Sequence, residues 1–209
     1  GFLCYESDIK IENLRVSETA NIENVVLNEE FNSNNNNKWW EGKQGADFNT
    51  FTSSGKYFIN TNKGFQVRAG IPLDLDYNNK FSIESDILLA DGKSDNSYHG
   101  IFWGGSSQFP HGEGDSFNYF IIDPDHNLYR IGKQDNSSGV DLELLESGWV
   151  ETTFLKSNNN IKIDRDGNEY KIYINGQLID VVTGLDSEGE YIGFLCYESD
   201  IKIENLRVS

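Results

Sequence analysis

The sequence predicts an all-β domain built as a sandwich of two antiparallel sheets. Many short segments rich in β-branched and aromatic residues alternate with clusters of Asn, Gly, Asp and Ser, which is the pattern of strands joined by turns. No stretch keeps a helical period over any length, and only 3 of the 209 residues are proline. Strands that are apolar on one side must bury it against another layer, so two sheets are expected to pack face to face.

The expected strands follow one another from residue 25 to the end of the sequence. They cover residues 25–31, 55–59, 65–68, 80–89, 99–103, 117–122, 128–132, 161–165, 169–174, 177–182, 191–197 and 201–208. The asparagine runs at 34–37 and 158–160 predict polar loop tips. Residues 140–145 fit either one helical turn or a strand.

Residues 161–179 predict two consecutive hairpins. Asp166-Gly167 and Asn175-Gly176 are dipeptides that accept the positive φ angles of two-residue turns. Isoleucine alternates with polar residues on either side of these turns. One face of this ribbon is therefore expected to pack and the other to be wet.

One segment of the chain occurs twice. Residues 1–17 and 193–209 both read GFLCYESDIKIENLRVS, and identity at every position excludes chance and divergent duplication. Two origins remain, namely a fragment of a tandem array of near-identical units or a segment duplicated by design, and the linker-like residues 18–24 favour the array. We therefore predict that 1–17 is the terminal hairpin of a preceding unit, that 18–24 is a linker, and that 25–209 is one sandwich.

The duplication predicts self-association. One sandwich has one slot for its terminal hairpin, and copy 193–209 is expected to fill it because that keeps the strand order. Copy 1–17 is then surplus, and we expect it to add to a sheet edge or a vacated slot of a neighbouring copy, head-to-tail or swapped. Its apolar side chains would make that contact: Phe2, Leu3, Ile9, Ile11, Leu14 and Val16.

The two cysteines, Cys4 and Cys196, occupy the same position in the two copies. Each unit thus has one cysteine, which excludes a disulfide within a unit. A buried cysteine acting as a small apolar side chain is the favoured interpretation, and a disulfide between copies is the alternative.

Four segments resemble the concanavalin A-like, laminin-G-like sandwich modules of bacterial surface and signalling proteins. They are residues 31–42, 118–133, 161–179 and 191–208. The resemblance covers residues 25–208. It implies a jelly-roll of two curved sheets whose first and last strands are adjacent and antiparallel. Modules of this group are often appended to other domains.

Some members of this fold are β-glucanases with Glu-x-Asp-x-(x)-Glu on one strand. The nearest match here is Glu84-Ser85-Asp86, but positions 88 and 89 are leucines. A retaining glycosidase needs two carboxyl groups about 5–5.5 Å apart, one of them held protonated. We therefore expect no enzyme activity. Simple alternation along the strand explains this segment, with the side chains of residues 81, 83, 85 and 87 pointing inward and those of residues 82, 84 and 86 pointing outward.

Two ligand sites are conceivable from the sequence. Trp103 with Tyr98 and His99, beside the loop 104–114, is the best candidate for a glycan-stacking platform, against a role in the core or as a lid. Calcium takes loop carboxylates and carbonyls, and the loop 91–96 offers Asp91, Asp95 and Asn96. Asp74 with Asp76 and Glu113 with Asp115 are further calcium candidates, and solvated acidic loops are the alternative in each case.

Charge limits the classes of partner. With 34 acidic and 17 basic residues the net charge is −17, which disfavours nucleic acid and anionic membranes. The sequence contains no run of about 18 apolar residues, so it predicts no segment that inserts into a membrane. The leading interpretation is a non-enzymatic extracellular repeat module acting in adhesion or as a structural unit, whose acidity keeps copies soluble. The alternative is a carbohydrate-binding, lectin-like module, and a glycoside hydrolase is least favoured.

Overall fold

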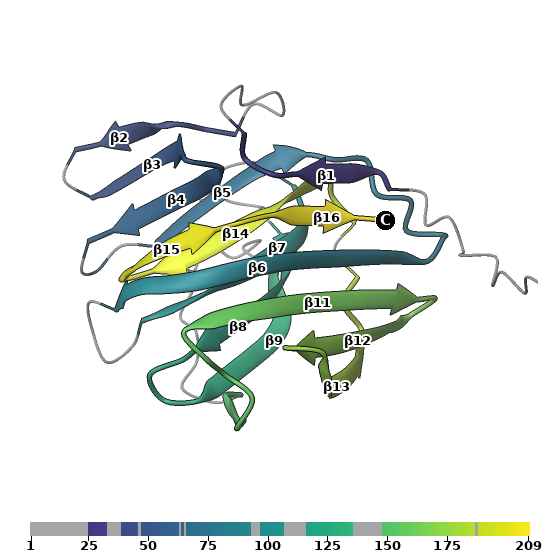
Figure 1. Ribbon diagram of the computed structural model, residues 1–209. Helices are drawn as coiled ribbons and strands as arrows, with labels where there is room; N and C mark the ends of the chain where they lie inside the picture. Colours follow the sequence, from purple (N-terminus) through teal and green to yellow (C-terminus); the bar gives the residue numbers. More distant parts are fainter. Residues whose placement is uncertain are drawn as a thin grey trace, which may run out of the picture.

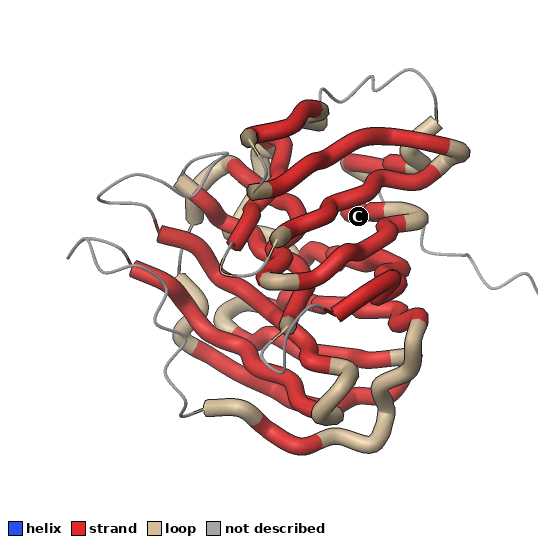
Figure 2. Tube along the Cα trace, turned by 90° about the vertical axis from the view of Figure 1, so that its left-hand side faces the viewer, coloured by secondary structure: helices blue, strands red, loops and turns tan. Residues whose placement is uncertain are grey.

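Two antiparallel sheets pack face to face around an apolar core (Figure 1). The computed structural model describes residues 25–32, 39–45, 47–62, 64, 66–92, 97–106, 116–135, 148–186 and 188–209. Figure 2 shows strands and loops throughout this part of the chain and no helix. None of these residues therefore lies in a helix long and apolar enough to cross a membrane. The predicted all-β sandwich is confirmed.

The larger sheet has ten strands in the described part of the chain. Its main path runs β13-β12-β11-β6-β15-β4-β3-β2, and β16 pairs with both β6 and β1. These strands are β1 (Leu27–Glu29), β2 (Gly42–Gln44), β3 (Phe48–Ser53), β4 (Lys56–Thr61), β6 (Phe81–Gly92), β11 (Asn158–Asp166), β12 (Glu169–Ile174), β13 (Gln177–Thr183), β15 (Ser199–Ile203) and β16 (Leu206–Val208).

The smaller sheet has six strands, in the order β10-β9-β8-β7-β14-β5. They are β5 (Gln66–Pro72), β7 (Tyr98–Gly105), β8 (Ser116–Asp123), β9 (Leu128–Asp135), β10 (Val150–Glu151) and β14 (Tyr191–Tyr197). The short strands β2 and β10 and the polar strand β3 were not expected from the sequence.

Strand β6 shows how alternation builds the core. Its side chains at 81, 83, 85 and 87 are buried, and those at 82, 84 and 86 are partly exposed, which confirms the prediction for this strand. A side chain such as Ile83, fully buried here, contributes about 1.5–3 kcal/mol relative to remaining in water. The core therefore depends on the inward rows of both sheets.

The two predicted hairpins are present, one of them with its turn shifted by one residue. Asn175 and Gly176 have φ angles of 51° and 78°, as a two-residue type I′ turn requires. Asp166 pairs directly with Glu169, so the first loop is Gly167-Asn168 rather than Asp166-Gly167. Gly167, with φ 63°, then takes the first central position, where type II′ turns favour glycine.

The expectation that residues 158–160 form a loop tip is wrong, because they begin β11 and pair with β6. Local hydrogen bonds hold these asparagines in the strand. Asn159 accepts from Lys156 N at 2.9 Å and donates to Lys156 O at 2.7 Å. Asn160 N donates to the Asn175 side chain at 3.0 Å. The runs at 34–37 and 140–145 lie outside the described residues.

The C-terminal segment is not a hairpin, contrary to the prediction. Strand β14 lies between β5 and β7 in the smaller sheet, whereas β15 lies between β4 and β6 in the larger one (Figure 1). The chain changes sheets at Glu198, a single residue in the left-handed region with φ 48°. Ser97 Oγ donates to Glu198 O at 2.6 Å, and Gly64 N donates to the Glu198 carboxylate. This corner makes residues 193–209 part of both layers.

The first and last strands of the sandwich are adjacent and antiparallel, as the resemblance implied. Leu27 of β1 faces Val208 of β16, and Val26 N donates to Val208 O at 2.8 Å. Copy 193–209 fills the terminal slot, as predicted. Copy 1–17 with its six apolar residues named above, and the linker 18–24, lie outside the described residues.

Candidate functional site

The outer face of the smaller sheet carries a second apolar cluster, separate from the core between the sheets. We call it the aromatic face. It consists of the buried Tyr98, Phe102, Phe117, Tyr119, Ile121 and Leu195 and of the partly exposed Trp149, Tyr191 and Tyr197. Alternation explains its composition, because the neighbouring residues Ile101, Trp103, Phe120, Phe194 and Cys196 face the inter-sheet core.

Three aromatic rings pack against one another at one end of the aromatic face. The rings of Tyr98 and Tyr197 stack with centroids 4.9 Å apart and an interplanar angle of 15°. Trp149 lies 6.0 Å from Tyr98 at 56°. Trp149 and Tyr197 are each partly exposed. Two aromatic rings therefore present part of their surface to solvent above a buried third ring.

Cationic side chains lie among these rings. The guanidinium of the fully buried Arg68 is 3.9 Å from the centroid of Phe117 and 5.3 Å from that of Phe102. Burial lowers the pKa of Arg68 to about 9. Arg130 lies 5.9 Å from the centroid of Tyr119. Cation–π attraction stabilises both guanidinium groups beside the rings. Two arginines therefore lie against the aromatic face of this acidic protein.

A glycine on β5 makes room for one of the rings. A Cβ atom at Gly70 would lie 2.6 Å from Cζ of Phe102 and 2.8 Å from the carbonyl oxygen of Ile192. Only a residue without a side chain allows the Phe102 ring to cover the sheet at this point. The aromatic face is therefore fitted to the backbone beneath it.

Of the three predicted glycan-stacking residues, the structure places only Tyr98 on this face. The expectation of an exposed ring at Trp103 is wrong, because Trp103 and His99 are both 0% exposed. Trp103 lies 5.7 Å from Tyr170 of the other sheet. Residues 99 and 103 point inward while residue 98 points outward, so the three cannot form one platform. Sequence analysis had grouped them by proximity along the chain.

The carboxylates of Glu84 and Asp86 are held by amide groups on the outer face of the larger sheet. Asn160 Nδ2 donates to Glu84 Oε1 at 3.0 Å and to Asp86 Oδ1 at 3.1 Å. Asn205 Nδ2 donates to Asp86 Oδ2 at 2.6 Å. The amide of Asn160 therefore bridges the two acids.

The predicted calcium loop lies partly outside the described residues. Asp91 is exposed at the end of β6, whereas Asp95 and Asn96 are not described, nor are Glu113 and Asp115. Over the described ranges, no group of three or more His, Cys, Asp or Glu side chains could hold a metal ion. Asp76 serves its own turn, since bonds from Asn78 N and Asn79 Nδ2 lower the pKa of its carboxyl group. Calcium therefore stays a prediction.

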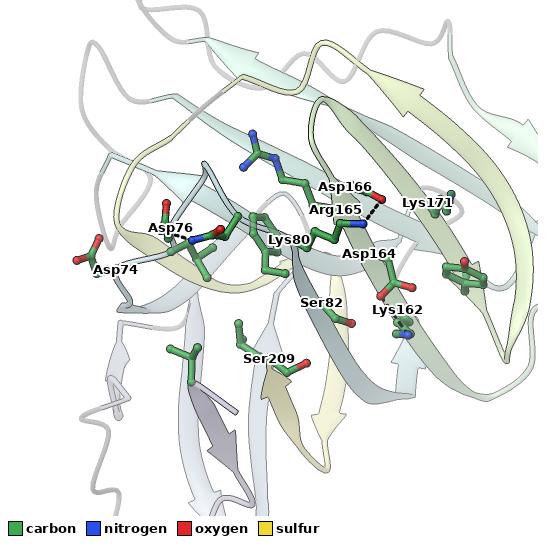
Figure 3. A pocket seen from close by; sticks show the side chains of 16 residues that line it. Asp74, Asp76, Lys80, Ser82, Lys162, Asp164, Arg165, Asp166, Lys171 and Ser209 are labelled. Carbon is green, nitrogen blue, oxygen red and sulfur yellow. Dashed lines mark hydrogen bonds and ion pairs between the residues drawn. The ribbon is translucent and has the colours of Figure 1, made fainter. Parts of the chain in front are cut away.

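A polar groove of about 850 Å³ lies beside the turn at residues 76–80 (Figure 3). Two ion pairs lie within the groove. Lys80 Nζ is 2.6 Å from Asp166 Oδ2, and Lys162 Nζ is 3.0 Å from Asp164 Oδ1. Partly neutralised charges give this groove less to offer a ligand than the exposed rings of the aromatic face.

Solved structures with the same fold include sugar-recognising and sugar-cleaving proteins. The carbohydrate recognition domain of Emp47p matches with a TM-score of 0.62 and 14% identity, covering 86% of this chain and 92% of that one. A β-glucanase from Bacillus licheniformis matches at 0.60 and 14%, covering 88% and 97%. A Bacillus subtilis protein of unknown function with a galectin-like fold matches at 0.56 and 10%, covering 88% and 94%.

These likenesses establish the fold. The chain is a concanavalin A-like sandwich of two antiparallel sheets. No protein-family model matches the chain, and no curated protein matches it either.

Several residues of the aromatic face were missed by sequence analysis. Trp149 was not among the residues proposed for the glycan site, and Tyr191 and Tyr197, like the neighbouring Arg68, fell only within expected strands. The available signal was the apolar run of residues 191–197 and 117–122, because strands without polar alternation are covered on both faces. An arginine within the apolar stretch of β5 was a second signal.

Proposed function

We propose that this protein is a non-enzymatic carbohydrate-binding module and that the aromatic face is its binding surface. The observation that carries the proposal is the pair of partly exposed rings, Trp149 and Tyr197, flanking the buried ring of Tyr98. Amphipathic rings beside a few polar groups are typical of small-molecule sites. The polar groups here are the tyrosine hydroxyls, Gln66 opposite Tyr197, and Arg130.

The absence of catalysis is part of the proposal. The outward positions of β7 are Tyr98, Gly100 and Phe102, and none of these is acidic. The one acidic pair that resembles a glucanase strand, Glu84 and Asp86, is engaged by Asn160 and Asn205. An acid held protonated is required for retaining hydrolysis. We therefore expect no β-glucan hydrolysis, and hydrolysis abolished by Glu84→Gln would contradict this.

The decisive experiment is a glycan array with the full chain, followed by calorimetry on the best glycan. Trp149→Ala removes one exposed ring and lies outside the duplicated segment, so no second copy can replace it. Tyr173→Ala is the matched control, because Tyr173 is also partly exposed but lies on β12 of the other sheet. We expect Trp149→Ala to weaken binding about tenfold or more, equivalent to about 1.4 kcal/mol, and Tyr173→Ala to leave it unchanged.

The result that would overturn the proposal is equally definite. Binding that both substitutions weaken equally, with unchanged melting temperatures, would place the ligand elsewhere. Failure of the wild-type chain to bind any glycan on the array would remove the function itself.

The second candidate function is an adhesive or structural unit that associates with copies of itself. It is favoured by the duplicated segment, whose described copy supplies strands to both sheets. Either role is that of an extracellular or cell-surface protein. Light scattering on the full chain and on a chain lacking residues 1–17 tests it. Oligomers that disappear on deletion would support it, and a full-length monomer at high concentration would contradict it.

A further inference from the structure

Residues 193–209 fill one continuous slot that runs through both sheets, which we call the C-terminal slot. Strand β14 has a neighbour on each side in the smaller sheet, and β15 and β16 both pair with β6 in the larger one. The apolar side chains in the slot are each at most 1% exposed: Phe194, Leu195, Cys196, Ile201, Ile203, Leu206 and Val208. An empty slot would open the core of the domain.

The same chain contains a second segment with every side chain that this slot requires. Phe2 corresponds to Phe194, Cys4 to Cys196, and Val16 to Val208. Because the two copies are identical at all positions, either copy would make the same contacts in the slot. Packing therefore does not distinguish them, and only the connections to the rest of the chain can.

The connection that the N-terminal copy would require is short. Val208 faces Leu27 across β16 and β1, so a copy 1–17 in the slot would place Val16 opposite Leu27, with residues 17–26 turning back between them. Facing Cα atoms in an antiparallel pair lie about 5 Å apart, and an extended chain spans about 3.3 Å per residue. A connection of this length closes with little loop entropy.

We propose that residues 1–17 and 193–209 of one molecule are interchangeable occupants of the C-terminal slot. The chain can then complete the same sandwich in two ways, which we call frames. In one frame the C-terminal copy fills the slot, and in the other, permuted frame the N-terminal copy fills it. The C-terminal copy is favoured because the fully buried Ile192, which pairs with Ile71, runs directly into it. In the permuted frame the chain must leave the sheet after Ile192.

The first test compares three full-length variants: Phe2→Ala, Phe194→Ala and the double variant. Phe194 is fully buried, with its ring 5.5 Å from Trp39, so its loss from the slot lowers the melting temperature by about 10 °C. We expect Phe2→Ala alone to melt like the wild type. Phe194→Ala should lose less than half as much as the double variant, because the intact N-terminal copy replaces the damaged one. Equal melting of Phe194→Ala and the double variant would overturn the proposal.

The second test reads the occupant directly by thiol labelling. A thiol in the slot is fully buried, as Cys196 is, and Cys196→Ser leaves Cys4 as the sole cysteine. In a Cys196→Ser/Phe194→Ala chain Cys4 should be protected at least tenfold relative to Cys196→Ser/Phe2→Ala, where the damaged copy cannot compete. Equal labelling rates would contradict the exchange. Light scattering must show monomers in both cases, since protection found only in dimers would refute exchange within one molecule and support self-association instead.

Discussion

His99 and Cys196 face each other across β7 and β14, and both side chains are fully buried. The Cys196 thiol donates to Ser199 O at 3.0 Å, whereas neither ring nitrogen of His99 has a hydrogen-bond partner among the described residues. Burial lowers the pKa of His99 to about 3 and raises the pKa of the Cys196 thiol to about 12. A neutral imidazole and a neutral thiol therefore lie together in the core.

The buried imidazole predicts a specific loss of stability in acid. Between pH 6.5 and about 3 the unfolded chain binds a proton at His99 that the folded chain does not. The contribution of His99 to the free energy of unfolding therefore falls as the pH falls, by about 1.4 kcal/mol per pH unit. Urea unfolding at pH 7 and pH 5 should show a shallower pH dependence for His99→Leu than for the wild type. The same dependence in both proteins would contradict the lowered pKa, because His99 would then take up its proton over the same pH range in the folded and the unfolded chain.

Backbone contact predicts that Gly100 cannot be replaced. A Cβ atom there would lie 2.0 Å from the carbonyl oxygen of Phe120 and 2.8 Å from Cα of Ile121, so the sheet itself would have to move. We expect Gly100→Ala to cost about 3 kcal/mol or more. Gly105→Ala is the control, because its closest atom is Cε2 of the Phe102 ring at 3.1 Å. Chemical denaturation of the two variants should separate them, and similar losses would contradict the clash.

The amide of Asn160 predicts a charge-dependent defect. Asn160→Asp would place a third carboxylate against Glu84 and Asp86, which now accept bonds from the Asn160 amide. We expect a loss of about 2 kcal/mol at pH 7, reduced at pH 4 because a protonated carboxyl group can donate. Asn158→Asp, on an exposed residue of the same strand, should show neither effect. Urea titrations at the two pH values make the comparison.

Calcium binding is testable without knowing its ligands. If the loop 91–96 holds the ion through Asp91, Asp95 and Asn96, millimolar calcium should raise the melting temperature and a chelator should lower it, because a ligand bound only by the folded state stabilises it. Asp91→Asn should remove the shift. Identical melting curves in calcium and chelator would dismiss the site.

Sequence patterns predicted both the position and the buried face of strands that have one apolar and one polar face. Strand β6 alternates apolar and polar residues, so both its position and its buried face could be read directly. Strand β7 is buried on both faces, so alternation alone could not tell which face meets the other sheet. Trp103 was therefore taken for a surface ring, although it lies in the inter-sheet core.

Long-range geometry was the other part that the sequence could not supply. Glu198 forms a one-residue corner between sheets, and glutamate has no turn signature, so a hairpin was predicted across it. The polar composition of β3 concealed a strand that pairs fully with β4. The aromatic face combines residues from β7, β8 and β14 with Trp149, and only strand order brings them together.

The pairing of Leu27 with Val208 also determines how the domain responds to tension. A force applied through residues preceding β1 and following β16 acts at the open end of their ladder, where Val26 N bonds Val208 O. Such a load unzips the hydrogen bonds one after another instead of shearing them together. We therefore expect the domain to resist only weak forces when it is pulled through residues preceding β1 and following β16.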